Sequence, residues 1–258
     1  MLRISLAGGP SMNERIDLDP LQPQEAIDYF RDKIVLTPAQ FYSLSRQAKA
    51  NAFTASEIAS LDVLQDIFEE LAAAIENGTT MEEFRKAVNA RMTARGWKGL
   101  TPYRADTIFR TNVQTAYQVG RWKQMTQPEV LASRPYGVYS AVMDKRTRAT
   151  HRAVHGVCRR LDDPFWDTWY PPNGYRCRCC VRTLSQRQVD KQNVKVATGS
   201  WQGYVTPPGE PARQLIPDPG FDYNPGKEAY RPDLSKYSKR LRAAYEKRQQ
   251  EKAKGSAP

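Results

Sequence analysis

A chain of 258 residues that is 40% hydrophobic and holds 18 prolines is long enough for one large or two modest domains, with extensive loops. No run of about 18 apolar residues occurs, which excludes a transmembrane helix, and the start lacks a convincing secretory signal, so we expect a reducing cytoplasm. The net charge of +11 is uneven, because residues 1–100 carry 11 Lys/Arg and 14 Asp/Glu whereas residues 101–258 carry 28 and 14. This polarity predicts two different partners, and the basic half suits a phosphate backbone.

Residues 1–100 are predicted to form a helical docking region. The segment PQEAIDYFRDKI (residues 23–34) reads as a short amphipathic helix with one apolar side, made of Ala26, Tyr29, Phe30 and Ile34. Thr37 and Pro38 then predict the cap and first turn of a helix that continues to about Ala50.

Two capping boxes predict the next two helices of this region. Thr54-Ala-Ser-Glu57 opens a helix that Gly78 ends, and Thr80-Met-Glu-Glu83 opens one that Gly96 ends. Their apolar residues recur at intervals of three or four residues: Ile58, Leu61, Leu64, Phe68, Leu71, Ile75, Phe84, Val88 and Met92. Such stripes are typical of a core or of helix–helix contacts, and we assign them no chemistry.

Residues 101–190 are predicted to form a second region. Thr101 and Pro102 start a long helix, the predicted buried side of which is Ile108, Phe109, Val113, Ala116, Tyr117 and Gly120. Residues 136–143 alternate like a half-buried strand, and a partner strand is expected from Cys177 to Thr183.

Both histidines and all four cysteines of the chain lie in one segment, residues 144–181. Thr147 as a cap and Gly156 as a stop predict a short helix. On it His151 and His155 stand at i and i+4 and project from one face.

The cysteines at the end of this segment complete a set of metal-binding residue types. In a strand, Cys177 and Cys179 point to one side and Cys180 to the other. Two histidines on the helix that face two cysteines on the strand would supply two nitrogens and two sulfurs. Zinc prefers four such ligands in a tetrahedron. The spacing is not that of a standard zinc finger.

Three readings without a metal remain open for these residues. The cysteines could pack as small hydrophobic residues. A disulfide could join Cys158 to one of the later three, which are too close in sequence to pair comfortably with one another. His155 could be a core histidine at the end of its helix.

Residues 191–258 are predicted to form a proline-rich arm and a basic tail. Residues 206–232 hold seven of the 18 prolines and read as an extended arm that Phe221, Tyr223 and Tyr230 could anchor on a surface. Residues 227–258 carry ten Lys/Arg and four Asp/Glu, and read as a basic helix or a disordered tail. The predicted fold class is therefore α+β, with a helical N-terminal half, a small metal-held module with a few short strands, and an extended basic C-terminal arm.

Several stretches together resemble one known family. They are PQEAIDYFRDKI followed by KANAFTASEI, then IFRTNVQTAYQVGR, DKRTRATHRAVHG, DPFWDTWYPPNGYRCRC and IPDPGFDYNPG. Their order and combination, which cover most of residues 23–226, resemble the phage Mu F-like minor head proteins, the head-morphogenesis proteins of tailed phages.

The resemblance implies a structural virion protein without enzyme activity, made in the bacterial cytoplasm and present in few copies inside the capsid near the portal. Its implied partners are the portal protein, other head proteins and double-stranded DNA, which it would contact without sequence preference. No membrane partner is implied. For DNA, the candidates are the arginines around the metal segment: Arg146, Arg148, Arg152, Arg159, Arg160, Arg176, Arg178 and Arg182. The alternative is that these arginines only keep the surface soluble.

The resemblance also implies a zinc site, of one ion per chain. Family signature regions often read as Cys-x-x-Cys followed by His and Cys-x-Cys, and here His151 takes the second position of the first pair. Arg148 or Thr147 stands where the first Cys would be, a departure that leaves the fourth ligand open. We expect His151, Cys177 and Cys179 as ligands with His155 as the fourth, and Cys158 and Cys180 as alternates.

Two other functions compete with a structural role. A metal-dependent nuclease or hydrolase acting on DNA would use the histidines together with nearby aspartates, although HExxH, P-loop and GxSxG motifs are absent. A toxin-like effector would need an added catalytic domain, and residues 184–258 do not resemble one.

Overall fold

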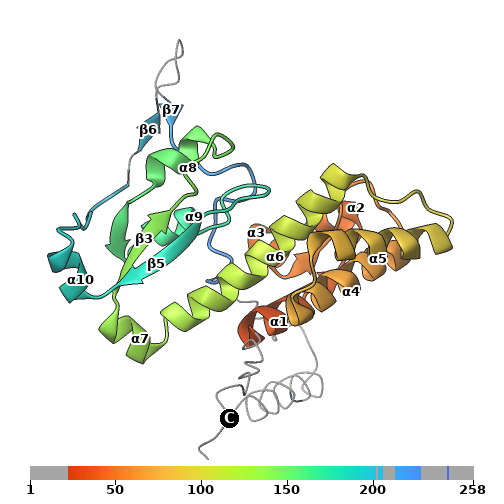
Figure 1. The fold of residues 1–258 in the computed structure, drawn as a ribbon, viewed down its shortest axis with the longest axis horizontal. Coiled ribbons are helices and arrows are strands. Elements are labelled where there is room, and N and C mark those ends of the chain that lie inside the picture. The colour runs from red at the N-terminus through yellow and green to blue at the C-terminus, as the bar shows by residue number, and fades with distance from the viewer. Residues whose placement is uncertain (1–22, 202, 206–212, 228–242, 244–258) are drawn as a thin grey trace, which may run out of the picture.

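The computed structural model describes residues 23–201, 203–205, 213–227 and 243, and these form an α+β structure with two hydrophobic cores (Figure 1). We call residues 23–121 the helical lobe and residues 122–227 the mixed module. The long helix α6 (Pro102–Met125) runs between them and contributes to both cores, with Ala105, Ala116 and Val119 in the core of the lobe and Trp122 and Met125, nearer its C-terminal end, in the core of the module.

The helical lobe packs its longer helices around a core of aliphatic and phenylalanine side chains. Its elements are α1 (Gln24–Arg31), β1 (Ile34–Val35), α2 (Pro38–Tyr42), α3 (Arg46–Ala50), β2 (Ala52–Phe53), α4 (Leu61–Asn77), α5 (Met81–Ala94) and α6. The first helix confirms the sequence prediction, except that Ile34 belongs to β1 and is 57% exposed. The strands β1 and β2 form a short parallel pair.

Two helix starts differ from the sequence prediction. The helix that begins at Pro38 ends at Tyr42, because Ser45 caps a separate helix, α3, by accepting a hydrogen bond from the Ala48 N–H group. The predicted box at Thr54–Glu57 does not form, since Glu57 has φ 64° and lies in a turn. Ser60 caps α4 instead.

The other predicted helix signals of this lobe are confirmed. Gly78 ends α4 in the left-handed conformation, and Thr80 forms a complete capping box with Glu83 at the start of α5. Thr101 caps α6 by accepting from the Arg104 N–H group, and Pro102 occupies its first turn. Tyr117, expected on the buried side of α6, is 39% exposed.

The mixed module is built on a three-stranded antiparallel sheet with strand order β4–β3–β5. Its elements are α7 (Pro128–Ser133), β3 (Tyr136–Ser140), α8 (Ala149–Val154), β4 (Cys158–Arg160), α9 (Phe165–Trp169), β5 (Cys180–Leu184), α10 (Gln186–Lys191), β6 (Tyr204–Val205) and β7 (Arg213–Gln214). The sequence predicted β3 and β5, although β5 begins after Cys177 and Cys179, and did not predict β4.

Aromatic residues fill the core on one face of this sheet. Trp166, Trp169, Tyr139 and Tyr170 are almost fully buried there. The sheet can approach Trp166 closely because Gly137 in β3 has no side chain, and an added Cβ there would stand 2.8 Å from the Trp166 ring. Helix α9 and the residue after it, Tyr170, are therefore part of the core of the module.

The described part of the predicted C-terminal arm packs against the module. Leu215 lies in its core, Asp218 bonds through its N–H group to the Asn173 carbonyl, and the Phe221 ring contacts Tyr175. The predicted basic helix at about 232–252 falls outside the described residues, apart from residue 243. None of the helices in the described part of the chain is long and apolar enough to cross a membrane.

Candidate metal centre

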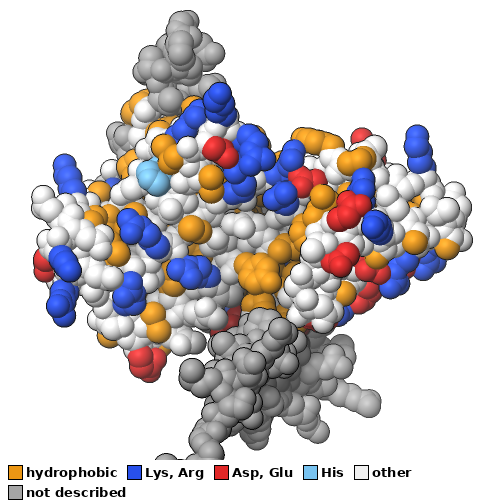
Figure 2. All heavy atoms as spheres, viewed as in Figure 1, with side chains coloured by type: hydrophobic (Ala, Val, Ile, Leu, Met, Phe, Trp, Pro, Cys, Tyr) orange, Lys and Arg blue, Asp and Glu red, His pale blue; other side chains and the backbone are white. Residues whose placement is uncertain are grey.

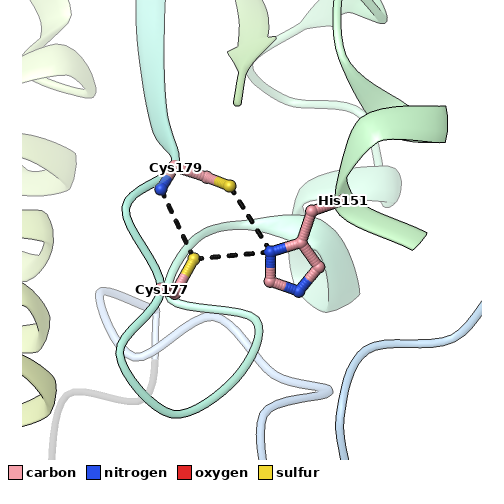
Figure 3. Close-up of side chains that lie close together, drawn as sticks. All are labelled: His151, Cys177 and Cys179. Atoms are coloured by element: carbon pink, nitrogen blue, oxygen red, sulfur yellow. Dashed lines mark hydrogen bonds between the residues drawn. The ribbon is translucent and has the colours of Figure 1, made fainter. Parts of the chain in front are cut away.

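Three of the predicted ligands meet in the mixed module (Figure 3). The His151 Nδ1 atom lies 3.4 Å from the Cys179 Sγ atom and 3.8 Å from the Cys177 Sγ atom. All three side chains are buried, with exposed fractions of 2–4%. They form a single compact donor set between α8 and the loop that leads into β5.

The separations fit a tetrahedral zinc ion. With a Zn–N bond of about 2.0 Å and Zn–S bonds of about 2.3 Å, tetrahedral angles place the nitrogen about 3.5 Å from each sulfur. The two measured N···S distances lie on either side of that value. One imidazole and two thiolates are also donors of the softness that zinc prefers.

The His151 ring is oriented by a hydrogen bond on its far side. Its Nε2 atom lies 3.3 Å from the Asn173 carbonyl oxygen, which can only accept, so Nε2 carries the proton and Nδ1 presents its lone pair to the sulfurs. A backbone carbonyl in this position is typical of metal-binding histidines. The ring is therefore oriented for metal binding through Nδ1.

Asn173, which holds that carbonyl, is fully buried and has a network of hydrogen bonds. Its side-chain oxygen accepts from the Tyr139 hydroxyl group at 3.0 Å, and its side-chain nitrogen donates to the Thr168 carbonyl at 3.1 Å. No motif in the sequence predicts this role for Asn173. The role depends on contacts with Tyr139 and His151, which are distant in the sequence.

Helix α6 holds the cysteine loop from the other side. The side chains of Gln114 and Gln118 donate to the Cys179 carbonyl at 2.9 and 3.3 Å, and Arg121 donates to the Val181 carbonyl at 3.0 Å. At the far end of β5, Arg134 donates to the Thr183 carbonyl. These helix side chains therefore satisfy carbonyl groups along the outer edge of β5.

The two thiols in the site affect one another. A hydrogen bond with Cys179 lowers the pKa of the Cys177 thiol to about 4. The same hydrogen bond and burial raise the pKa of the Cys179 thiol. One thiolate therefore forms readily, while the second requires a cation nearby to offset the charge.

The structure does not bring the expected fourth ligand to this group. Helix α8 ends at Val154 with His155 as its C-cap residue, and His155 is not part of the group formed by His151, Cys177 and Cys179. His155 is exposed, and its Nδ1 atom accepts a hydrogen bond from the Ala141 N–H group. In this structure the two histidines therefore do not meet in one donor set.

The two alternate ligands also lie elsewhere. Cys158 is buried on β4 in a separate small cluster with Val138, Leu184 and Val189. Cys180 is exposed on β5. All four cysteines are free thiols, so a disulfide to Cys158 does not form.

The arginines expected to contact DNA fall into two groups. Arg159 is 3% exposed, pairs with Asp163 at 2.8 Å and lies over the Phe165 and Trp201 rings. Its guanidinium group thus belongs to the interior, and it cannot reach a phosphate outside. The others are exposed or half-buried: Arg146, Arg148, Arg152, Arg160, Arg176, Arg178 and Arg182.

Four of the exposed or half-buried arginines stand around the donor set. A small hollow of about 20 Å³ lies beside the donors. It is lined by the three donors, by Arg146, Arg148, Arg176 and Arg178, and by Val142 and Thr147. Arg178 forms a two-pronged ion pair with Asp144, at 2.6 and 2.8 Å. Bonding to Arg178 holds the pKa of the Asp144 carboxyl well below its usual range.

Comparison with known proteins places the chain among phage proteins. Residues 65–182 match the model of the family described as "Phage Mu protein F like protein". The chain is 35% identical to the "Putative capsid assembly protein F" of Escherichia phage Mu, in an alignment that covers 83% of this chain and 56% of that protein. It is 33% identical to the "Mu-like prophage FluMu F protein" of Haemophilus influenzae, in an alignment that covers 76% of this chain and 54% of that protein.

The chain thus spans about half the length of the curated relatives it matches. No solved structure matches it significantly. The matched region contains the long helix α6, most of the three-stranded sheet and all three donor residues. Through residues 65–182 the chain belongs to the phage Mu protein F-like family, as its motifs indicated.

Proposed function

We propose that this protein is a structural head-morphogenesis protein of a tailed bacteriophage. The observation that carries the proposal is its 35% identity, over 83% of the chain, to a protein named as a capsid assembly protein. It would be made in the host cytoplasm and be built in few copies into the capsid interior near the portal. The portal protein and other head proteins would be its partners, and it would act without catalysis.

The role of the mixed module in this proposal is to present a rigid surface. A zinc ion bound by His151, Cys177 and Cys179 would supply a cross-link between α8 and the loop before β5. The matching N···S distances and the proton position on His151 support zinc as the metal. The chain's own residues do the rest, because Asn173 orients the histidine and α6 holds the cysteine loop.

DNA would be the second partner, contacted through phosphates. Figure 2 shows Lys and Arg side chains spread over the face of the mixed module, while acidic side chains gather mainly over the helical lobe. Such a face suits binding to the DNA backbone without sequence preference. The candidate contacts are Arg146, Arg148, Arg152, Arg160, Arg176, Arg178 and Arg182, without Arg159.

The assembly role is tested by complementation of a phage that lacks the gene for this protein. We expect heads to be aberrant or to lack DNA, and the full chain to restore them and to be found in purified particles by mass spectrometry. Affinity capture of the full chain from infected cells should recover the portal protein. Normal, infectious particles without the protein would contradict the proposal.

The DNA role is tested by measuring duplex affinity at increasing salt. Phosphate contacts predict a steep fall between about 50 and 200 mM salt, with a similar affinity for unrelated sequences. Replacing one contacting arginine, for example in Arg182→Gln, should lower the salt slope by about one unit. An affinity that does not change with salt would rule out phosphate contact.

A metal-dependent nuclease is the second candidate, and one observation favours it. Only three donors meet among the residues that the structure describes, and catalytic zinc sites commonly keep a fourth position for water. Metal-dependent nicking of supercoiled DNA, abolished by Cys177→Ala, would favour the enzyme over the structural role.

A further inference from the structure

The donor set has an open side within the mixed module. His151, Cys177 and Cys179 line a hollow of about 20 Å³, which is about the space that one water-sized sphere requires. The rest of its lining is dominated by arginines from the loop before α8 and from the cysteine loop. A group bound in this hollow would be next to the donors and within reach of cationic side chains.

The fourth ligand of a metal here cannot be another nitrogen or sulfur donor of this chain in the described arrangement. The chain has only two histidines and four cysteines. The other three of these residues, His155, Cys158 and Cys180, lie outside the donor set. A tetrahedral zinc ion with three protein ligands takes its fourth ligand from outside.

Charge favours an anion as that ligand. Two thiolates and a divalent cation sum to zero, so the donor set itself would not repel a negative group. Around the hollow, four arginines face three aspartates: Asp144 pairs with Arg178, Asp218 with Arg148, and Asp106 with Arg176.

One of the four arginines is only weakly paired. Both carboxylate oxygens of Asp144 are hydrogen-bonded to Arg178, and Arg146 approaches Asp144 only to 3.6 Å. The Arg146 side chain is 80% exposed and lines the hollow. Its guanidinium group is therefore the one most available to a new ligand.

We propose that an oxyanion of the phosphate class places one oxygen in the hollow, where it becomes the fourth ligand of the metal, and that Arg146 binds the oxyanion. This inference rests on the proposed metal site. Guanidinium groups bind phosphate oxygens by strong, charge-assisted hydrogen bonds. The phosphate could be free in solution or belong to the backbone of DNA, and the two sources share this chemistry.

The test uses the full chain loaded with Co²⁺, because the visible absorption of the cobalt ion reports its ligands directly. We expect inorganic phosphate to shift that absorption and to saturate. Arg146→Gln should weaken the response about tenfold. Lys145→Gln removes the same charge from the neighbouring exposed residue, which does not line the hollow, and should leave the response unchanged.

A short DNA duplex replaces phosphate in a second titration. The same shift with the duplex would assign the phosphate to DNA, and a shift with inorganic phosphate alone would assign it to the free ion. Either result supports the proposal.

Three results would overturn the proposal. An absorption that neither phosphate nor the duplex changes would mean that the fourth position is closed or holds water, while the structural metal site would stand. Equal weakening by Arg146→Gln and Lys145→Gln would leave only a general charge effect. A chain that binds no metal would remove this proposal together with the metal site.

Discussion

The helical lobe buries a continuous set of apolar side chains and pairs its two buried carboxylates, Asp66 and Asp106, with arginines that reach the surface, whereas the mixed module places polar groups inside its core. In the lobe, Leu64, Ile67 and Phe30 are fully buried. In the module, Asn173, His151 and Arg159 are buried at 0–3% exposure, and each has specific partners. The lobe therefore depends on packing volume, which many residues share, and the module on a few polar links.

This comparison predicts that metal removal acts on one region. If zinc is present at about a thousandfold excess over its dissociation constant, it stabilises the folded state by about 4 kcal/mol. A strong chelator should lower the melting temperature and expose Trp166 and Trp169, which a red shift of tryptophan emission would report. Helix content, measured by circular dichroism, should fall later. Simultaneous loss of both signals would mean that the two regions unfold as one.

A cavity in the helical lobe should lower the stability of the protein without changing its metal content. Leu64→Ala removes a fully buried side chain and should lower the free energy of unfolding by about 3 kcal/mol. Because the metal ligands all lie in the mixed module, the zinc content per chain should stay at its wild-type value. Elemental analysis and denaturant unfolding measure the two quantities, and loss of zinc in this variant would contradict the separation.

Two neighbouring arginines of β4 test the difference between an internal and an external polar group. Arg159→Gln leaves the half-buried Asp163 carboxylate without its cation and should cost about 2 kcal/mol. Arg160→Gln removes a guanidinium group that is 53% exposed and should change stability by less than about 0.5 kcal/mol. Equal effects in thermal unfolding would contradict the burial of Arg159.

The smallest effect is expected from the surface ion pairs of the lobe. Hydrogen bonding to Arg31 lowers the pKa of the Glu76 carboxyl below its usual 4.5. The resulting stability, about 0.5 kcal/mol, is therefore present above pH 4.5 and is lost as the pH falls through the lowered value. Glu76→Gln should remove this acid-dependent part, so its stability should match wild type only in strong acid.

Local signals in the sequence predicted some elements correctly. They failed where the rest of the chain determines which of several signals is used. The cap at Thr37 and the capping box at Thr80 form, because each needs only its own first turn. The box at Thr54 has the same pattern but fails, since Glu57 adopts a left-handed turn and Ser60 takes over the cap. Helix starts can therefore be predicted, but the choice between competing caps cannot.

The candidate site shows the same limit. Residue types alone indicated His151, Cys177 and Cys179, because these are the residues that zinc prefers. The helical spacing also suggested His155, which in the structure is exposed and lies outside the group of three donors. The contribution of α6 to the site could not be predicted, because Gln114 and Gln118 lie far from Cys179 in the sequence.

The side chains along β5 have a consequence for how the protein behaves at high concentration. A strand at the edge of a sheet is a template on which another chain can add a strand, and unprotected edges promote aggregation. Here Gln114, Gln118, Arg121 and Arg134 occupy carbonyls on the outer side of β5 and of the residue before it. On the opposite edge, Ala197 donates its N–H group to the Cys158 carbonyl of β4. Both edges of the sheet are thus partly occupied by other groups of the same chain, which would oppose the addition of a strand from another copy.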